Sequence, residues 1–174
     1  LNRVDAARPP ANQGSDHRPP VFLKVAPDLE DSELDDIAAA LLASQIDGLI
    51  VSNTTLSRAG TAGSVHAGQA GGLSGKPLFE RSTIILARMR TRLPKAFPLI
   101  GVGGISSAAD ALAKVEAGAS LVQLYTGLIY EGPGLVADIL SGMSRHLDRT
   151  GQSSLGELVG SKTDAWAARA LTVE

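Results

Sequence analysis

Cysteine is absent from this chain of 174 residues, and aromatic residues make up only 3% of it. The lack of cysteine excludes disulfide bonds, thiolate metal ligands and a cysteine nucleophile, so any redox chemistry needs a bound cofactor. The net charge of -2 leaves no basic stripe, and few rings are available to stack on bases. We therefore expect no nucleic-acid partner.

The sequence also lacks a long apolar run and an initiator methionine. No stretch has the pattern of a membrane span or of a signal peptide. We expect a soluble chain without a targeting segment. Because the first residue is Leu1, we expect the chain to begin in mid-protein.

Apolar runs of about five residues, each followed by an amphipathic segment, recur along the chain. These runs are residues 21–25, 48–52, 98–102 and 120–124. Strands that are continuously apolar are typical of parallel α/β sheets whose crossovers are helices. Four consecutive βα units predict either half of a (β/α)8 barrel, which needs a partner half, or an open four-stranded sheet.

Three segments are predicted from this pattern. Residues 1–20 contain two proline pairs and are expected to be the end of a preceding helix followed by a loop. Residues 21–150 hold the four βα units. Residues 151–174 form a C-terminal helical extension that docks on the outside, with Trp166 as a packing anchor.

Helix ends give more local predictions. Ser32 and Asp35 are expected to form a capping box. Ser107 should begin the helix after the third strand, and Gly118 should end it. The acidic run over residues 28–36 is interpreted as a helix N-terminus favoured by the helix dipole, not as paired catalytic carboxylates.

Glycine and hydroxyl residues follow the third and fourth apolar runs. The third runs into Gly101-Val-Gly-Gly-Ile105, and the fourth into Tyr125-Thr-Gly127. Backbone N–H groups at two neighbouring strand ends, each leading to a helix N-terminus, are suited to hold a phosphate. The glycine spacing differs from that of the dinucleotide-binding fingerprint. The sequence therefore predicts a phosphorylated cofactor or substrate.

Lys24 lies within an otherwise apolar strand. An unpaired ammonium is costly there, so Lys24 either extends outward to water or faces an anionic ligand. Strand alternation places Phe22 and Lys24 on one face, and Leu23 and Val25 on the other. A lysine that points into a barrel lumen can stabilise negative charge on a cofactor.

Two polar segments allow a structural and a functional interpretation. Ser52-Asn-Thr-Thr55 is either a turn held by local side-chain bonds or a set of groups that reads a planar polar substrate. Gly71-Gly-Leu-Ser-Gly75 is either a flexible linker or a loop that approaches a ligand closely. The histidines His17, His66 and His146 have no metal-ligand spacing, so no metal site is predicted and each is interpreted as solvated.

Together these motifs resemble the dihydroorotate dehydrogenase family, in particular its quinone-dependent class. The resemblance rests on Lys24-Val-Ala-Pro-Asp-Leu29, Ser52-Asn-Thr-Thr-Leu56, Gly71-Gly-Leu-Ser-Gly-Lys-Pro-Leu78, Gly101-Val-Gly-Gly-Ile105 and Leu124-Tyr-Thr-Gly-Leu-Ile-Tyr-Glu-Gly-Pro133. Each motif is weak alone, but all of them occur in the family's order and spacing. The last one distinguishes the quinone-dependent class from the soluble class. The match extends over residues 19–147.

The resemblance implies a (β/α)8 TIM barrel that holds FMN and oxidises dihydroorotate to orotate in pyrimidine (UMP) biosynthesis, with quinone as electron acceptor. It implies FMN contacts from Lys24, Ser52, Gly75, Gly104, Tyr125 and Thr126. Among these, Lys24 would lie beside the flavin ring, and the last three would bind the phosphate through backbone groups. Asn53 and Thr54 would hydrogen-bond the pyrimidine of the substrate. The family often has Thr at the position of Ser52, which preserves the hydroxyl.

The resemblance also implies that parts of the enzyme lie outside this chain. The serine that acts as catalytic base, the quinone entry and the membrane-contacting helices belong to the family's N-terminal half. This chain then has no catalytic residue and is inactive alone, while the intact protein is a peripheral protein of the inner or cytoplasmic membrane. Two alternatives are a non-catalytic half-barrel module that binds FMN or another phosphate, and a different flavin or phosphosugar barrel enzyme.

Overall fold

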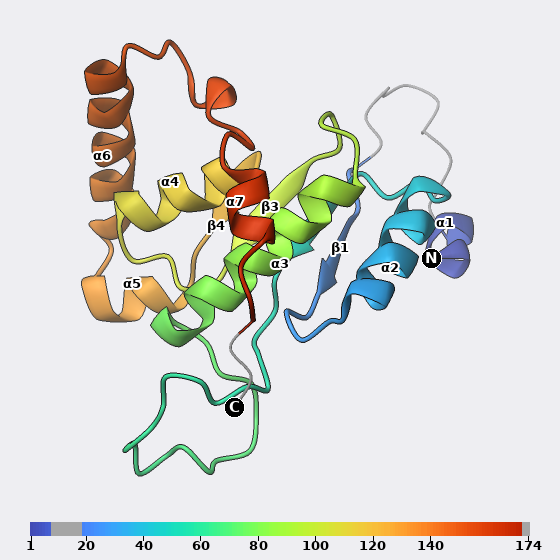
Figure 1. The fold of residues 1–174 in the computed structure, drawn as a ribbon, viewed down its shortest axis with the longest axis horizontal. Coiled ribbons are helices and arrows are strands. Elements are labelled where there is room, and N and C mark those ends of the chain that lie inside the picture. Colours follow the sequence, from blue (N-terminus) through green and yellow to red (C-terminus); the bar gives the residue numbers. More distant parts are fainter. Residues whose placement is uncertain (8–18, 172–174) are drawn as a thin grey trace.

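Four parallel strands form the centre of the molecule in a computed structural model that describes residues 1–7 and 19–171. The strands are β1 (Phe22–Val25), β2 (Gly48–Val51), β3 (Leu99–Val102) and β4 (Leu121–Gln123), and they lie in chain order in one sheet (Figure 1). Each pair is parallel, so every connection is a crossover that contains helix. The predicted parallel α/β architecture is confirmed, as a sheet open at β1 and β4.

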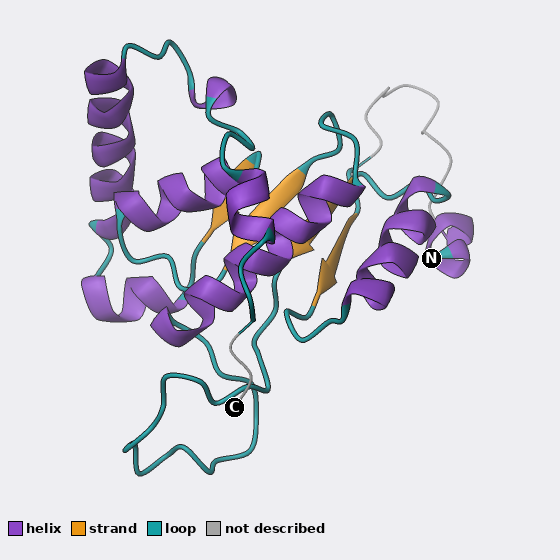
Figure 2. Cartoon of the chain, viewed as in Figure 1, coloured by secondary structure: helices purple, strands orange, loops and turns teal. Residues whose placement is uncertain are grey.

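Helices and short 3-10 turns account for about half of the remaining described residues. They are α1 (Asn2–Ala7), α2 (Asp31–Leu42), α3 (Phe79–Arg92), α4 (Ala108–Ala117), α5 (Thr126–Glu131), α6 (Leu135–Thr150) and α7 (Thr163–Ala167), with short 3-10 turns η1 (Lys76–Leu78) and η2 (Leu155–Glu157). Figure 2 shows α3, α4 and α7 in front of the strands. No helix among the described residues combines the length and apolar character needed to cross a membrane.

The main core lies between the sheet and α2 and α3. Leu49, Val51 and Leu99 point from the strands into this layer, where they meet Ile85 and Leu86 of α3. All five are fully buried. Burial of each such side chain contributes about 1.5–3 kcal/mol, so this layer fixes the positions of the strands and therefore of the loops at their ends.

The other face of the sheet is left partly exposed by the described residues, and we call it the open face. The strand register places Lys24, Ile50, Ile100 and Leu121 in one row across this face. Lys24 is exposed, and Leu121 at the edge is 60% exposed. Phe22 is exposed as well, whereas Val25 is buried, as the predicted alternation of β1 requires. This row is therefore apolar apart from Lys24.

The start of α2 differs from the predicted capping box. Glu30 is the N-cap, and the box pairs it with Glu33, whose carboxylate accepts the Glu30 N–H at 2.8 Å. Ser32 lies inside the first turn, because the helix already begins at Asp31. The carboxylate of Asp35 instead accepts a hydrogen bond from Arg92 of α3 at 2.6 Å.

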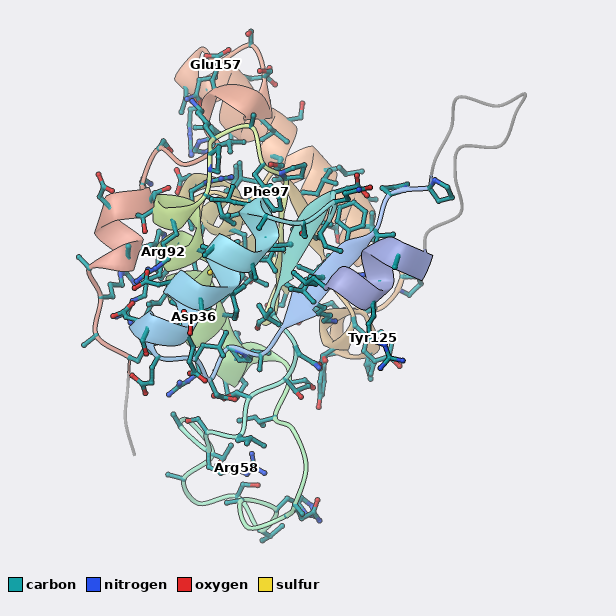
Figure 3. The ribbon with its side chains drawn as sticks, turned by 90° about the vertical axis from the view of Figure 1, so that its right-hand side faces the viewer. Asp36, Arg58, Arg92, Phe97, Tyr125 and Glu157 are labelled. Carbon is teal, nitrogen blue, oxygen red and sulfur yellow. The ribbon has the colours of Figure 1, made fainter. Side chains whose placement is uncertain are left out.

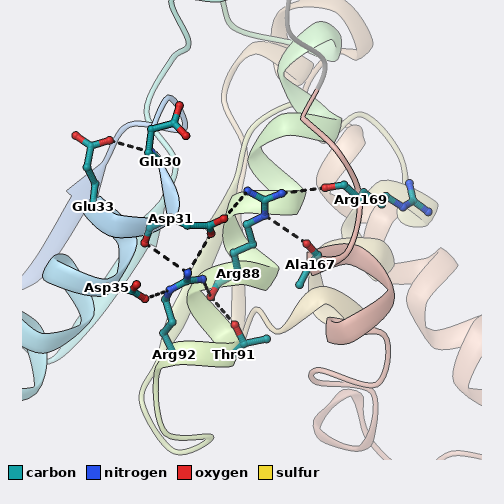
Figure 4. Close-up of polar contacts among 9 residues, drawn as sticks. All are labelled: Glu30, Asp31, Glu33, Asp35, Arg88, Thr91, Arg92, Ala167 and Arg169. Carbon is teal, nitrogen blue, oxygen red and sulfur yellow. Dashed lines mark hydrogen bonds and ion pairs between the residues drawn. The ribbon is translucent and has the colours of Figure 1, made fainter.

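Two arginines of α3 connect α2 to the C-terminal segment. Arg92 binds Asp35 and also Asp31, the latter at 3.0 Å (Figure 4). Arg88 donates to the carbonyl of Ala167 at 3.3 Å and to that of Arg169 at 3.0 Å. We call these contacts the arginine clamp of α3.

The end of the chain is less helical than predicted. Residues 153–171 contain only the turn η2 and the five-residue helix α7, not one continuous helix. Trp166 nevertheless anchors this segment. It is 9% exposed, and its ring meets the ring of Phe79 edge-on with centroids 6.2 Å apart. After β4 the chain forms two helices, α5 and α6, rather than one.

The predicted ends of α4 are confirmed. The N-cap is Ser107, whose hydroxyl accepts the N–H of Asp110 at 3.2 Å. Gly118 ends the helix with a φ of 124°, a conformation that favours glycine. In the N-terminal segment, α1 supplies the expected helix, whereas residues 8–18, with His17, lie outside the described residues.

Candidate functional site

The loops at the carboxyl ends of the four strands surround one cavity of about 290 Å³. Its lining includes every site residue predicted from the sequence, namely Lys24, Ser52, Asn53, Thr54, Gly75, Gly104, Tyr125 and Thr126. They come from the ends of β1 to β4 and from the glycine-rich loop after β2. The parallel topology brings them together, because the carboxyl ends of parallel strands share one edge of the sheet.

Lys24 extends from the open face of the sheet toward this cavity. Within residues 1–7 and 19–171 its ammonium has no hydrogen-bond or ion-pair partner. Its charge therefore faces water or a ligand. An anionic group in the cavity can pair with it.

The segment after β2 makes the local bonds of a turn. The Ser52 hydroxyl, which is 1% exposed, donates to the Asn53 carbonyl at 2.9 Å. The side-chain oxygen of Asn53 accepts the N–H of Thr54, also at 2.9 Å. Among the described residues, nothing pairs with the Asn53 amide nitrogen or the Thr54 hydroxyl. Local bonds thus hold the backbone, and two exposed polar groups remain for a ligand.

Two glycines bring backbone close to the cavity. Gly104 has a φ of 72°, and a Cβ atom there would lie 2.4 Å from the Cβ of Phe79. Gly75 has a φ of 79°, and its Cβ would lie 3.1 Å from a methyl carbon of Thr126. Larger residues would force these loops apart. The two positions keep the loops after β2, β3 and β4 in close contact.

Backbone donors line the same region. In the part of the chain that the structure describes, the N–H groups of Gly104, Tyr125 and Thr126 have no hydrogen-bond acceptor. A second cavity of about 570 Å³ adjoins the first and shares Gly75, Gly104 and Thr126 with it. Tyr125 directs its ring to solvent and is 77% exposed (Figure 3), so its contribution comes from the backbone. Unpaired N–H groups of this kind suit phosphate oxygens.

The glycine-rich loop is tethered, unlike a free linker. Leu73 forms an isolated antiparallel bridge with Thr55. Arg58 reaches across the loop and donates to the carbonyls of Gln69 and Gly71 at 2.8 and 2.7 Å (Figure 3). Closer to the cavity, the Thr126 hydroxyl donates to that of Ser74 at 3.1 Å. These contacts hold the loop beside the segment that follows β2.

Sequence reasoning missed the role of Asp28. It does not belong to the N-terminal turn of α2, as the interpretation of the acidic run assumed. Its carboxylate accepts hydrogen bonds from the Thr55 hydroxyl at 2.5 Å and from the Leu56 N–H at 2.8 Å. The signal was its place directly after Pro27, in the loop at the carboxyl end of β1.

Lys114 was also missed. Its side chain is fully buried behind the glycine turn after β3, and its Nζ donates to the Ser82 hydroxyl at 2.6 Å. The Val102 and Phe79 carbonyls each lie 3.4 Å from Nζ. Burial lowers the pKa of Lys114 well below its ordinary value, and the charge of Asp110 opposes this shift. The available signal was a lysine on the apolar face of a helix.

The two described histidines, His66 and His146, have separate partners. The ring of His66 pairs with the Gln69 amide at 3.0 Å, and that of His146 with Arg149 at 3.3 Å. No group of three or more His, Cys, Asp or Glu that could hold a metal ion occurs among the described residues.

Comparison with known proteins identifies the family. The family model for dihydroorotate dehydrogenase matches residues 5–147. The chain belongs to the dihydroorotate dehydrogenase family. A relative from Allorhizobium ampelinum is 57% identical over 168 residues, and one from Brucella ovis is 58% identical over 171 residues. Both are named dihydroorotate dehydrogenase (quinone).

Both of these relatives are longer than the chain. The two alignments cover 97% and 98% of it but only 46% and 47% of the relatives, so the chain spans about half their length and corresponds to their C-terminal half. A crystal structure of the dihydroorotate dehydrogenase from Eimeria tenella in complex with ferulenol matches with a TM-score of 0.80 and 36% identity. The match covers 86% of this chain and 40% of the Eimeria tenella chain. The four βα units are therefore part of a TIM barrel fold.

Proposed function

We propose that this chain carries the FMN-phosphate site and part of the orotate site of a quinone-dependent dihydroorotate dehydrogenase. The intact enzyme would oxidise dihydroorotate to orotate in pyrimidine biosynthesis, with quinone as electron acceptor. The observation that carries the proposal is that all predicted cofactor and substrate residues line one cavity at the carboxyl edge of the sheet. The names of the relatives from Allorhizobium ampelinum and Brucella ovis support the same activity.

The residues present fit FMN. The unpaired N–H groups of Gly104, Tyr125 and Thr126 would bind the phosphate, and the close approach of the loops at Gly75 and Gly104 leaves backbone, not side chains, to contact the cofactor. When bound, FMN would supply the redox chemistry, which amino-acid side chains do not provide. Ser52, fixed by its bond to Asn53, would contact the cofactor from the end of β2.

Lys24 supplies the positive charge of the cavity. Its ammonium has no partner among the described residues, so it is available to stabilise negative charge on a bound ligand. On the substrate side, the Asn53 amide and the Thr54 hydroxyl can hydrogen-bond the carbonyl and N–H groups of a pyrimidine ring. They would set the orientation of dihydroorotate.

The remaining functions belong to the rest of the intact protein. We assign the catalytic serine base, the quinone entry and the contact with the membrane to the half of the enzyme that this chain does not include. The chain alone would then be inactive. A non-catalytic half-barrel that binds FMN is the competing hypothesis, because no general base is assigned to the cavity described above.

Replacing Lys24 by Ala in the full-length protein that carries this chain tests the proposal. Loss of a preorganised charge in a catalytic site typically costs about 10²–10³-fold in rate, so dihydroorotate-dependent flavin reduction should slow by that factor. The melting temperature should stay close to that of the parent, because the Lys24 ammonium makes no hydrogen bond or ion pair among the described residues. Stopped-flow flavin absorbance and thermal unfolding measure the two quantities.

Asp36→Asn is the matched control, because Asp36 lies on the exposed side of α2, away from the cavity. It should reduce flavin at the parental rate. A parent that binds FMN but never oxidises dihydroorotate would contradict the dehydrogenase proposal and favour the binding module. Unchanged flavin reduction in Lys24→Ala would remove the proposed role of Lys24.

A further inference from the structure

Asp28 does not line the cavity, but its side chain contacts loops that meet there. One carboxylate oxygen accepts the Thr55 hydroxyl at 2.5 Å, and the other accepts the Leu56 N–H at 2.8 Å. The first oxygen also lies 3.5 Å from a guanidinium nitrogen of Arg81 on α3. The side chain is 23% exposed. Two donors and one cation therefore compensate the charge of Asp28.

Thr55 extends this connection to the glycine-rich loop. It is buried, and its backbone exchanges two hydrogen bonds with Leu73: its N–H donates to the Leu73 carbonyl at 3.1 Å, and its own carbonyl accepts the Leu73 N–H at 2.8 Å. The loop after β1, the segment after β2 and the glycine-rich loop are thus joined through Asp28, Thr55 and Leu73.

The segment between these anchors carries Asn53 and Thr54. On one side the Asn53 N–H donates to the carbonyl of Val25 at 2.8 Å, and on the other side Thr55 is held by Asp28. Both Asn53 and Thr54 are exposed, and the one side-chain bond between them is local. Their orientation therefore depends on the two flanking anchors.

We propose that Asp28 is a positioning residue for substrate recognition: through Thr55 it fixes the orientation of Asn53 and Thr54 toward the pyrimidine. This inference rests on the proposed dehydrogenase function. Asp28 acts at a distance, because a carboxylate that touched the anionic substrate would repel it, whereas here the charge is compensated by Thr55, Leu56 and Arg81.

The test uses the full-length protein that carries this chain, with substitutions that remove one contact each. Asp28→Asn keeps the size of the side chain but replaces one acceptor oxygen by a donor. Thr55→Val keeps the shape and removes the hydroxyl, and Thr55→Ser restores the hydroxyl. Because Thr55→Val changes no charge, it tests the link even where Asp28→Asn lowers the yield of folded protein.

Both Asp28→Asn and Thr55→Val should raise the KM for dihydroorotate about tenfold, the effect of a lost buried hydrogen bond and a misplaced recognition group. The KM for quinone and the FMN content should stay within about twofold of the parent, since neither site contacts Asp28 in this proposal. Thr55→Ser should return the KM for dihydroorotate to near the parental value. The double variant Asp28→Asn/Thr55→Val should be no worse than Thr55→Val, because both changes break one connection.

Steady-state kinetics, flavin absorbance and thermal unfolding separate the outcomes. A parental KM for dihydroorotate in folded, FMN-loaded Asp28→Asn and Thr55→Val would overturn the positioning role while the dehydrogenase function stands. The positioning role would also be overturned if the KM for quinone rose as much as that for dihydroorotate and FMN content fell, because such changes indicate a general structural role. A parent without dihydroorotate turnover would refute the proposed function and this inference with it.

Discussion

Lys114 is a buried amine whose neighbours are mostly neutral. Its Nζ donates to the Ser82 hydroxyl and lies 5.0 Å from the centre of the Phe79 ring. Desolvation by burial lowers its pKa well below 10.5, and only the charge of Asp110 acts in the opposite direction. The folded protein therefore releases the Lys114 proton more readily than the unfolded chain does.

This difference predicts a pH dependence of stability. Between the lowered pKa of folded Lys114 and 10.5, the unfolded chain binds the extra proton, so the free energy of unfolding should rise with pH. At a pH below both the folded and the unfolded pKa of Lys114, this gain in the free energy of unfolding is lost, because the buried amine is then charged in the folded protein as well. One proton corresponds to a slope of at most about 1.4 kcal/mol per pH unit.

Lys114→Met should remove this slope. Urea unfolding of parent and variant across neutral to alkaline pH measures it, and the stability of the parent relative to the variant should increase with pH. Lys95→Met, at an exposed position, is the control and should keep the parental slope. A stability difference that is constant or falls with pH would show that Lys114 stays charged in the folded protein.

Single residues also show which features of the site can be predicted from the sequence. Lys24 and Asn53 were predicted from their position at strand ends, which is a local property. Asp28 and Lys114 were missed because their roles depend on partners far away in the sequence: Asp28 binds a residue 27 positions later, and Lys114 one 32 positions earlier. Only the fold brings these pairs together.

Helix α3 packs against the sheet and contacts both α2 and α7. It is buried along most of its length against the sheet, and its arginine clamp holds α2 on one side and the C-terminal segment on the other. Arg92 is partly exposed, at 20%, and its two carboxylate partners are more than half exposed. Water therefore screens these ion pairs considerably.

Arg92→Met should lower the free energy of unfolding by about 1 kcal/mol, the upper range for partly exposed ion pairs. The loss should shrink in 1 M salt, at about 3 Å Debye length, because salt weakens the same pairs in the parent. Urea unfolding at low and high salt measures both effects. Arg145→Met, which removes a bond to Ser141 within α6, should change stability less. A salt-independent loss would point to packing of the arginine stem.

The elements were easier to predict than their ends. Strands β1 to β4 lie within the predicted apolar runs, since burial on the helix-covered face demands apolar residues. The capping box was wrong because Ser32 matches the usual motif while Glu30 does not, yet Glu30 has the extended backbone of an N-cap. The terminal segment is interrupted at Gly160, whose φ of 78° ends any helix. Local sequence patterns alone do not decide between alternative helix starts and ends.

The whole molecule has an open sheet with two unpaired edges. Among the described residues β1 pairs only with β2, and β4 only with β3. The open face carries an apolar row around Lys24, and Leu121 at its edge is mostly exposed. Unpaired edges and exposed apolar faces favour association with further strands. Relatives about twice as long as this chain have additional sequence to supply them.

If the other half of the intact protein closes the barrel, both edge strands gain a second neighbour. In parallel strands alternate N–H groups point to opposite sides, so half of the β1 and β4 amides should become protected only on closure. Hydrogen exchange followed by mass spectrometry should show slow exchange of residues 22–25 and 121–123 in the full-length protein and faster exchange in the isolated chain. Strands β2 and β3 are the internal control and should be protected in both. Edge strands that exchange in the full-length protein as fast as loop residues 56–72 would mean that the sheet stays open.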